Sequence, residues 1–115
     1  MLKKILEEML FLEKINVVAL IGRDGFVIEI ATHQTTDIVA LGSFSSYVLE
    51  FFEENATLMD KGLVKQMVFE YENGAIILTP ASKEELLAVI TESSSATGRA
   101  IYTIAHTRSR VQAVL

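Results

Sequence analysis

Residues 67–80, MVFEYENGAIILTP, carry the clearest local fold signal in the chain. The dipeptide Asn73-Gly74 separates two runs that are rich in aliphatic and aromatic residues, and Asn-Gly in that setting is a strong sign of a tight β-hairpin. Pro80 stops the second run because proline cannot donate a hydrogen bond to a neighbouring strand. The sequence therefore predicts two antiparallel strands, at residues 63–72 and 75–79.

Three further strands are predicted outside this hairpin. Residues 16–22 form a continuous apolar run, as expected for a strand that is buried on both faces. The tripeptide Arg-Asp-Gly at 23–25 then supplies a turn, and residues 26–31 resume as a second strand. The last strand is predicted at residues 86–91.

Helical patterns flank these strands. Apolar residues at helical spacing predict an amphipathic helix at residues 2–14 and a long helix at residues 38–59. Asp37 and the two threonines before it can cap the start of the long helix, and Gly62 suits its end. The serines at 93–95 predict the start of a last helix that reaches about residue 114. The order of helix, two strands, helix, three strands and helix favours a three-layer α/β/α sandwich.

Length and composition limit the class of protein. The chain has 115 residues, no cysteine and a net charge of −5. We therefore expect a single domain over residues 1–115, no disulfide or cysteine zinc site, and no general binding of nucleic acid. The apolar runs are too short to span a bilayer and the first residues lack a signal-peptide core. These features predict a cytoplasmic protein with no membrane insertion.

Motifs of known enzyme classes are missing from the sequence. It has no phosphate-binding glycine loop, no G-x-G-x-x-G, no H-E-x-x-H and no G-x-S-x-G, and its only histidines are His33 and His106. The paired acids at 53–54 and 84–85 have the character of solvated surface positions. We therefore expect a protein that is not an enzyme and has no metal site and no cofactor.

The long helix carries two apolar stripes side by side. The first has core character and comprises Ile38, Leu41, Ser45, Val48, Leu49, Phe52, Ala56 and Met59. The second comprises Ala40, Phe44, Tyr47, Phe51 and Leu58. One face of a sheet cannot cover both stripes. The second stripe therefore either contacts another chain or is buried because the helix lies unusually deep in the core of its own chain. Half of the residues are hydrophobic (50%), a high share for a lone domain of this size, and this surplus favours an interface.

The strand predicted at 63–72 is a second candidate contact. Met67, Val68, Phe69 and Tyr71 make it strongly β-prone, and a long exposed strand edge invites pairing with another chain. Pairing of this edge with itself across a two-fold axis would remove that hazard. The alternative is an interior strand without a free edge.

The last helix carries a polar stripe of Arg99, Tyr102, His106 and Arg110. A patch that binds an anion or a partner is one interpretation. A solvated helix face is the favoured one, because basic residues near a helix C-terminus complement its dipole. Arg108 lies on a different side of this helix.

Taken in order, these segments resemble the Roadblock family of dynein light chains and GTPase regulators, and within it the MglB-like bacterial branch. The resemblance spans about residues 6–105. It rests on the strand, Asp-Gly, strand opening at 17–28, on the hairpin at 67–80, and on residues 86–90 leading into the last helix. It implies an α/β (α+β) fold of profilin- and longin-like type, with a five-stranded antiparallel sheet between helices.

The resemblance also implies a homodimer, joined through the long helix and the third strand, that binds a small Ras-like GTPase as its GTPase-activating partner. We expect dimer contacts at Phe44, Tyr47, Phe51, Leu58, Met67, Phe69 and Tyr71. We expect the GTPase to face the polar side of the long helix, at Ser43, Glu50 and Glu54. Two other functions stay open: a light-chain-like structural scaffold without effect on a GTPase, and a sensor of a small ligand.

Overall fold

A five-stranded antiparallel sheet lies at the centre of the protein. The structure is a computed structural model that describes residues 1–12, 14–93 and 96–115. Along the chain its elements are α1 (Leu2–Leu10), β1 (Ile15–Gly22), β2 (Val27–Thr32), α2 (Ile38–Leu58), β3 (Met67–Tyr71), β4 (Gly74–Pro80), β5 (Glu85–Thr91) and α3 (Thr97–Val114). The strand order in the sheet is β2-β1-β5-β4-β3, and every neighbouring pair is antiparallel. The predicted order of elements is confirmed.

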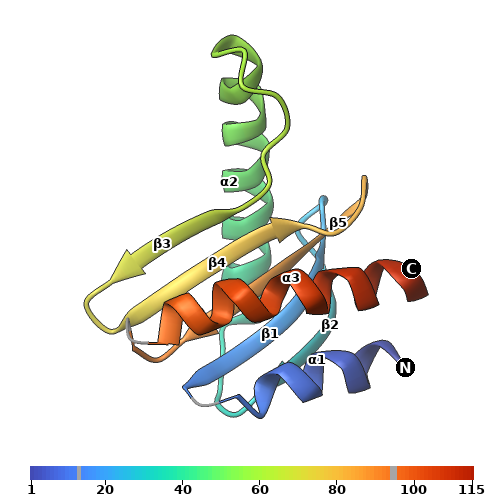
Figure 1. Cartoon of the computed structure of the whole chain (residues 1–115), viewed down its shortest axis with the longest axis vertical. Helices are drawn as coiled ribbons and strands as arrows, with labels where there is room; N and C mark the ends of the chain where they lie inside the picture. Colours follow the sequence, from blue (N-terminus) through green and yellow to red (C-terminus); the bar gives the residue numbers. More distant parts are fainter. Residues whose placement is uncertain (13, 94–95) are drawn as a thin grey trace.

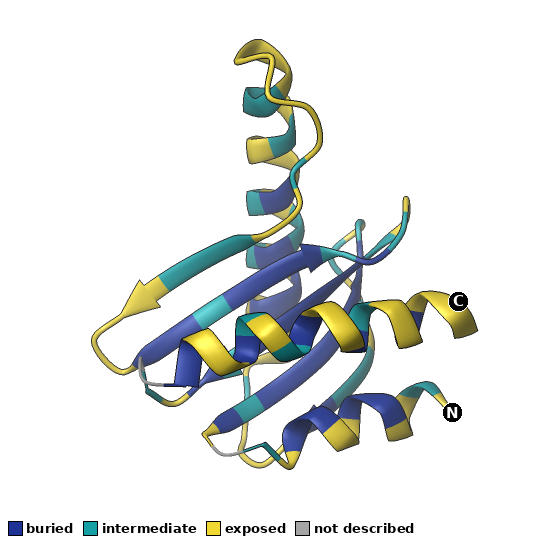
Figure 2. Cartoon of the chain, in the orientation of Figure 1, coloured by how far each residue is buried: buried dark blue, intermediate teal, exposed yellow. Residues whose placement is uncertain are grey.

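Helices cover both faces of this sheet, so the predicted three-layer sandwich is confirmed as well. Figure 1 shows α2 on one face, and α1 and α3 on the other. Successive strand residues point to opposite faces, which divides the core into two clusters. In β1, Val18 and Leu20 pack toward α1 and α3, whereas Val17 and Ile21 pack toward α2. β1 is buried at all but one position, and the central strands are the most buried part of the fold (Figure 2).

The predicted β3–β4 hairpin is present, but its loop lies one residue earlier. Tyr71 pairs with Gly74, so the loop residues are Glu72 and Asn73. Gly74 has a φ of +136°, and a Cβ atom there would lie 2.0 Å from the backbone oxygen of Thr91. Glycine is needed at this position because the start of β4 presses directly on the end of β5.

Two predicted elements are shorter in the structure. α1 ends at Leu10 rather than near residue 14, and Lys14 has a positive φ of 65°, which is incompatible with a helix. β3 begins at Met67 rather than at residue 63. The segment before it is tied to β4 by a hydrogen bond from Thr79 Oγ1 to the backbone oxygen of Lys65, 2.8 Å long.

α2 is capped at its start by the predicted residue and at its end by a different one. The carboxylate of Asp37 accepts the backbone N–H of Ala40 at 3.0 Å. At the other end Asp60 takes a left-handed φ of 54°, and the N–H groups of Asp60 and Lys61 bond back to carbonyls of the last turn. The prediction of Gly62 as the cap is therefore wrong, because Asp60 already closes the helix.

The start of α3 also differs from prediction. Its N-cap is Ala96, which offers no side-chain oxygen, so the expected cap at Ser93 is wrong. The other expected caps, Ser94 and Ser95, lie outside the described residues. Among the helices that the structure describes, none has both the length and the apolar character needed to cross a membrane.

Candidate functional site

The long helix α2 rests on the sheet over its first half only. A helix of 21 residues spans about 31 Å, and its C-terminal half extends past the sheet (Figure 1). Its buried residues are Leu41, Gly42, Ser45 and Leu49. Ile38, Phe52 and Met59 of the predicted core stripe are exposed. That part of the prediction is wrong: Phe52 and Met59 lie in the C-terminal half and at the end of α2, past the sheet, and Ile38 is the first residue of the helix.

The first half of α2 is held close to the β1–β2 turn. A Cβ atom added to Gly42 would lie only 2.0 Å from the backbone oxygen of Gly25. Gly25 itself has a φ of +93°, in the region that favours glycine. This pair of glycines lets helix and turn touch through their backbones, and it fixes the direction in which the rest of α2 projects.

The second apolar stripe of α2 is exposed over most of its length (Figure 2). Tyr47 and Leu58 are 70% and 84% exposed, and Phe51 is exposed as well. The rings of Tyr47 and Phe51 stack with centroids 6.4 Å apart. The stripe is therefore not part of a deep core of this chain, which was the alternative to an interface.

Phe44, the remaining aromatic of the stripe, connects α2 to β3. Its ring meets the ring of Phe69 edge to face, with centroids 5.7 Å apart. Phe69 and Met67 are half-buried in the cluster under α2, whereas Tyr71 is exposed. β3 is an outer strand of the sheet, so the alternative of an interior strand is wrong. We call the surface formed by Phe44, Tyr47, Phe51, Leu58, Met67, Phe69 and Tyr71 the α2–β3 face.

The polar side of α2 adjoins this face. Ser43, Glu50 and Glu54 are all exposed. α2 contains three glutamates and no lysine or arginine. A partner that docks on this side of the helix would thus meet negative charge.

The third glutamate of α2, Glu53, is not simply solvated as predicted. Arg23 Nη1 donates to Glu53 Oε1 at 2.5 Å, and Arg23 Nη2 donates to the backbone oxygen of Ser82 at 3.4 Å. Glu85, another of the acids predicted to be solvated, accepts a hydrogen bond from the Ser82 hydroxyl. Arg23 thereby links three separate segments: the β1–β2 turn, α2 and the β4–β5 loop.

The polar stripe of α3 lies on the surface and contacts α1. Arg110 forms an ion pair with Glu8 of α1, and this contact lowers the pKa of Glu8 and raises that of Arg110. The rings of Tyr102 and His106 meet edge to face, 5.4 Å apart. Arg99 is exposed. The favoured interpretation as a surface face therefore agrees with the structure.

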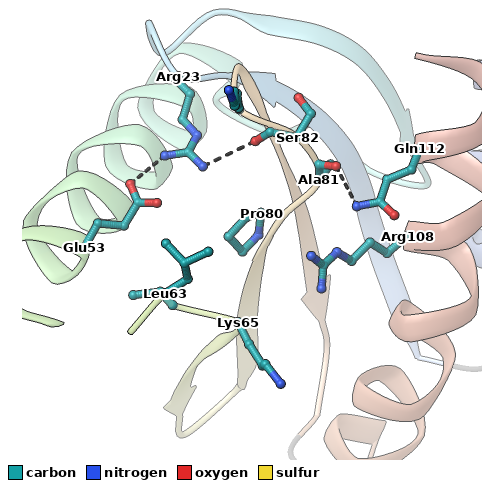
Figure 3. A pocket seen from close by; sticks show the side chains of 11 residues that line it. Arg23, Glu53, Leu63, Lys65, Pro80, Ala81, Ser82, Arg108 and Gln112 are labelled. Atoms are coloured by element: carbon teal, nitrogen blue, oxygen red, sulfur yellow. Dashed lines mark hydrogen bonds and ion pairs between the residues drawn. The ribbon is translucent and has the colours of Figure 1, made fainter. Parts of the chain in front are cut away.

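A cavity on the opposite side of α3 went unnoticed in the sequence. It has a volume of about 560 Å³ and is lined by Arg23, Lys65, Arg108 and Gln112, among others (Figure 3). These residues come from three distant segments of the sequence and share no motif. Only the tertiary structure brings them together. The one hint of this cavity in the sequence is that Arg108 lies on a different side of its helix from the polar stripe.

Chemically, the α2–β3 face can bind but offers no reacting groups. Its members are aromatic, aliphatic and thioether side chains. In the described part of the chain no cluster of three or more His, Asp or Glu residues could hold a metal ion. The arrangement is suited to protein contact.

Comparisons with known proteins identify the domain family. Residues 1–91 match the sequence model of the Roadblock/LC7 domain. No curated protein sequence matches the chain.

Solved structures share the fold. MglB of Myxococcus xanthus has a TM-score of 0.90 at 17% identity, over 98% of this chain and 93% of that one. A Roadblock/LC7 domain from Streptomyces avermitilis has a TM-score of 0.88 at 16% identity, over 97% and 95%. A second MglB structure, described as having a tetrameric arrangement, has a TM-score of 0.90 at 16% identity, over 98% and 86%. At these identities the likeness concerns the fold.

Proposed function

Because the chain belongs to the Roadblock/LC7 domain family, we propose that it is a cytoplasmic regulatory module that forms a homodimer and binds a small Ras-like GTPase. The observation that carries the proposal is the exposed aromatic stripe of α2 beside the outer strand β3. Exposed apolar surface of this kind marks contact with another protein.

The two halves of the α2–β3 face support the proposed homodimer. β3 has a row of backbone groups at its outer edge, and a second β3 related by a two-fold axis can pair with it. The same axis would bring two α2 stripes together and remove Tyr47 and Phe51 from water. A second copy of the chain would thus pair the free edge of β3 and cover the α2 stripe at the same time. An unrelated partner would need one surface that fits the strand edge and another that fits the stripe.

The GTPase contact is proposed on the polar side of α2. Ser43 and Glu50 lie at the edge of the α2 stripe, and Glu54 lies one turn from both Phe51 and Leu58, so we expect the GTPase to meet these side chains at the border of the dimer face. Their negative charge favours a GTPase surface with basic character, because complementary charge speeds encounter and fixes orientation.

GTPase activation would act indirectly. The surface of α2 contains no arginine that could enter a GTPase active site and stabilise the transition state. Acceleration of hydrolysis would instead come from repositioning the loops of the GTPase itself. The same lack of an arginine makes a scaffold that binds a GTPase without activating it the second candidate function.

One assay separates these functions. Single-turnover GTP hydrolysis is measured for a small Ras-like GTPase with and without the purified chain, and binding is measured with the GTPase in each nucleotide state. Faster hydrolysis is the expected result. Binding without acceleration would favour the scaffold, and failure to bind in either nucleotide state would contradict both.

A further inference from the structure

The cavity beside α3 has the features of a ligand site separate from the α2–β3 face. Its walls come from the β1–β2 turn, Glu53 of α2, the segment before β3, the end of β4, the β4–β5 loop and the last turns of α3 (Figure 3). The volume of about 560 Å³ is within the range of small-molecule pockets. The site goes beyond the proposed function, since neither the dimer nor the GTPase contact uses it.

Positive charge is concentrated in this cavity, although the protein as a whole is acidic. Arg23, Lys65, Lys83 and Arg108 line it, which is four of the ten basic residues in the chain. Glu53 is the one acidic residue in the lining, and it is paired with Arg23. In the described part of the chain no carboxylate forms an ion pair with any of the other three. The cavity therefore has uncompensated positive charge.

Arg108 is the central group of the cavity. Its side chain extends from α3 toward Pro80, as Figure 3 shows. Its Nε atom is shielded from solvent and has no hydrogen-bond partner among the described residues. A guanidinium donates in a planar fork that matches carboxylate and phosphate oxygens. Gln112, one turn further along α3, is held in place by a hydrogen bond to the backbone oxygen of Ala81 at 2.8 Å.

Apolar residues make up much of the remaining lining. Leu63, Val64, Pro80 and Ala81 contribute to it, beside the polar residues Ser82 and Gln112. A bare inorganic ion would leave these apolar residues without a contact. We propose that the cavity binds a small organic anion that carries a carboxylate or phosphate on an apolar body, with Arg108 as the principal anion contact and Lys65 as a second one.

The test is an NMR titration of the full chain labelled with ¹⁵N, at constant ionic strength, with phenyl phosphate and with benzoate as probes. The Arg108 Nε–Hε signal is expected to shift and saturate with at least one probe. The preferred probe identifies phosphate or carboxylate as the recognised group. Inorganic phosphate is expected to bind several-fold more weakly than phenyl phosphate, and equal affinity would overturn the assignment of an apolar body.

Variants test the position of the site. R108Q is expected to weaken binding about tenfold, which is the effect of losing one charge-assisted contact. R99Q removes an exposed arginine of the same helix and is expected to leave affinity unchanged. Lys65 lies outside the helices, so K65Q serves as the second test if R108Q does not fold. K65Q is expected to weaken binding about threefold. Absence of saturable shifts, or equal weakening by R99Q, would overturn the proposal.

Discussion

The ring of Phe44 meets the ring of Phe69 edge to face, with centroids 5.7 Å apart and an angle of 70° between their planes. Phe44 belongs to α2 and Phe69 to β3, which are separated in sequence by the projecting half of the helix. This contact joins the two elements into one continuous surface within each chain. A partner that covers the Phe44 end of the stripe therefore lies beside β3 as well.

The first prediction concerns this pair of rings. Replacing either ring by alanine removes a half-buried phenyl group and should lower the free energy of unfolding by about 2 kcal/mol. The double variant should lose about 1 kcal/mol less than the sum, because edge-to-face pairs have a favourable coupling energy. Urea denaturation in the background of F51E, which we expect to be monomeric, measures the coupling without a contribution from association. Strict additivity would show that the two rings do not stabilise each other.

The second prediction concerns the close approach of α2 to the β1–β2 turn. G42A should destabilise the protein, although alanine favours a helix over glycine by about 1 kcal/mol. The added methyl group would lie 2.0 Å from the Gly25 oxygen, so helix and turn must move apart. G98A in α3 is the matched control, because among the described residues no atom outside the adjoining helix backbone lies within 4 Å of an added Cβ there. Thermal unfolding should show opposite signs for the two variants, and a stabilising G42A would contradict the backbone contact.

The third prediction concerns pH. The hydrogen bond from Arg110 holds the pKa of Glu8 below its ordinary value in the folded protein. The ion pair therefore contributes stability above the ordinary pKa of a glutamate, and this contribution is lost as the pH falls through the lowered pKa. R110Q should be slightly less stable than the wild type at pH 7, and the difference should shrink toward pH 3. Urea titrations at both pH values test this, and a difference that does not change with pH would contradict it.

The fourth prediction concerns the GTPase contact and rests on the proposed function. E50K combined with E54K reverses charge on the polar side of α2 and should weaken GTPase binding at least about tenfold. E7K on α1, on the opposite side of the sheet, should have little effect. Surface plasmon resonance with the GTPase on the chip gives both affinities. An unchanged affinity for the α2 variant would place the GTPase elsewhere on the dimer.

The pattern of apolar and turn-forming residues predicted much of the fold, because it reflects which residues of a segment are buried and where the chain turns. The continuous apolar run of β1, the Asn73-Gly74 turn signal and the double stripe of α2 each indicated an element or a surface. Periodicity also failed in a specific way at Phe52 and Met59. Their spacing along the helix is that of core residues, but the sheet ends before it reaches them. The spacing of residues in a helix does not show how far the neighbouring sheet extends.

The anion cavity could not be predicted for a related reason. Arg23, Lys65 and Arg108 come from three distant segments, and each looks like an ordinary surface residue in its own sequence context. Their convergence depends on the strand order, which places the end of β4 between the turn after β1 and the last helix. Only long-range topology contains that information.

The central claim is that the α2–β3 face joins two copies of this chain. Sedimentation equilibrium at micromolar concentration tests it most directly. The wild type and Y102E, an exposed aromatic replaced on the opposite face of the sheet, should both have twice the chain mass of 12.7 kDa. F51E places a charge in the stripe and should sediment at 12.7 kDa while keeping its circular dichroism spectrum. A wild type at 12.7 kDa, or an F51E variant that remains dimeric, would contradict the account.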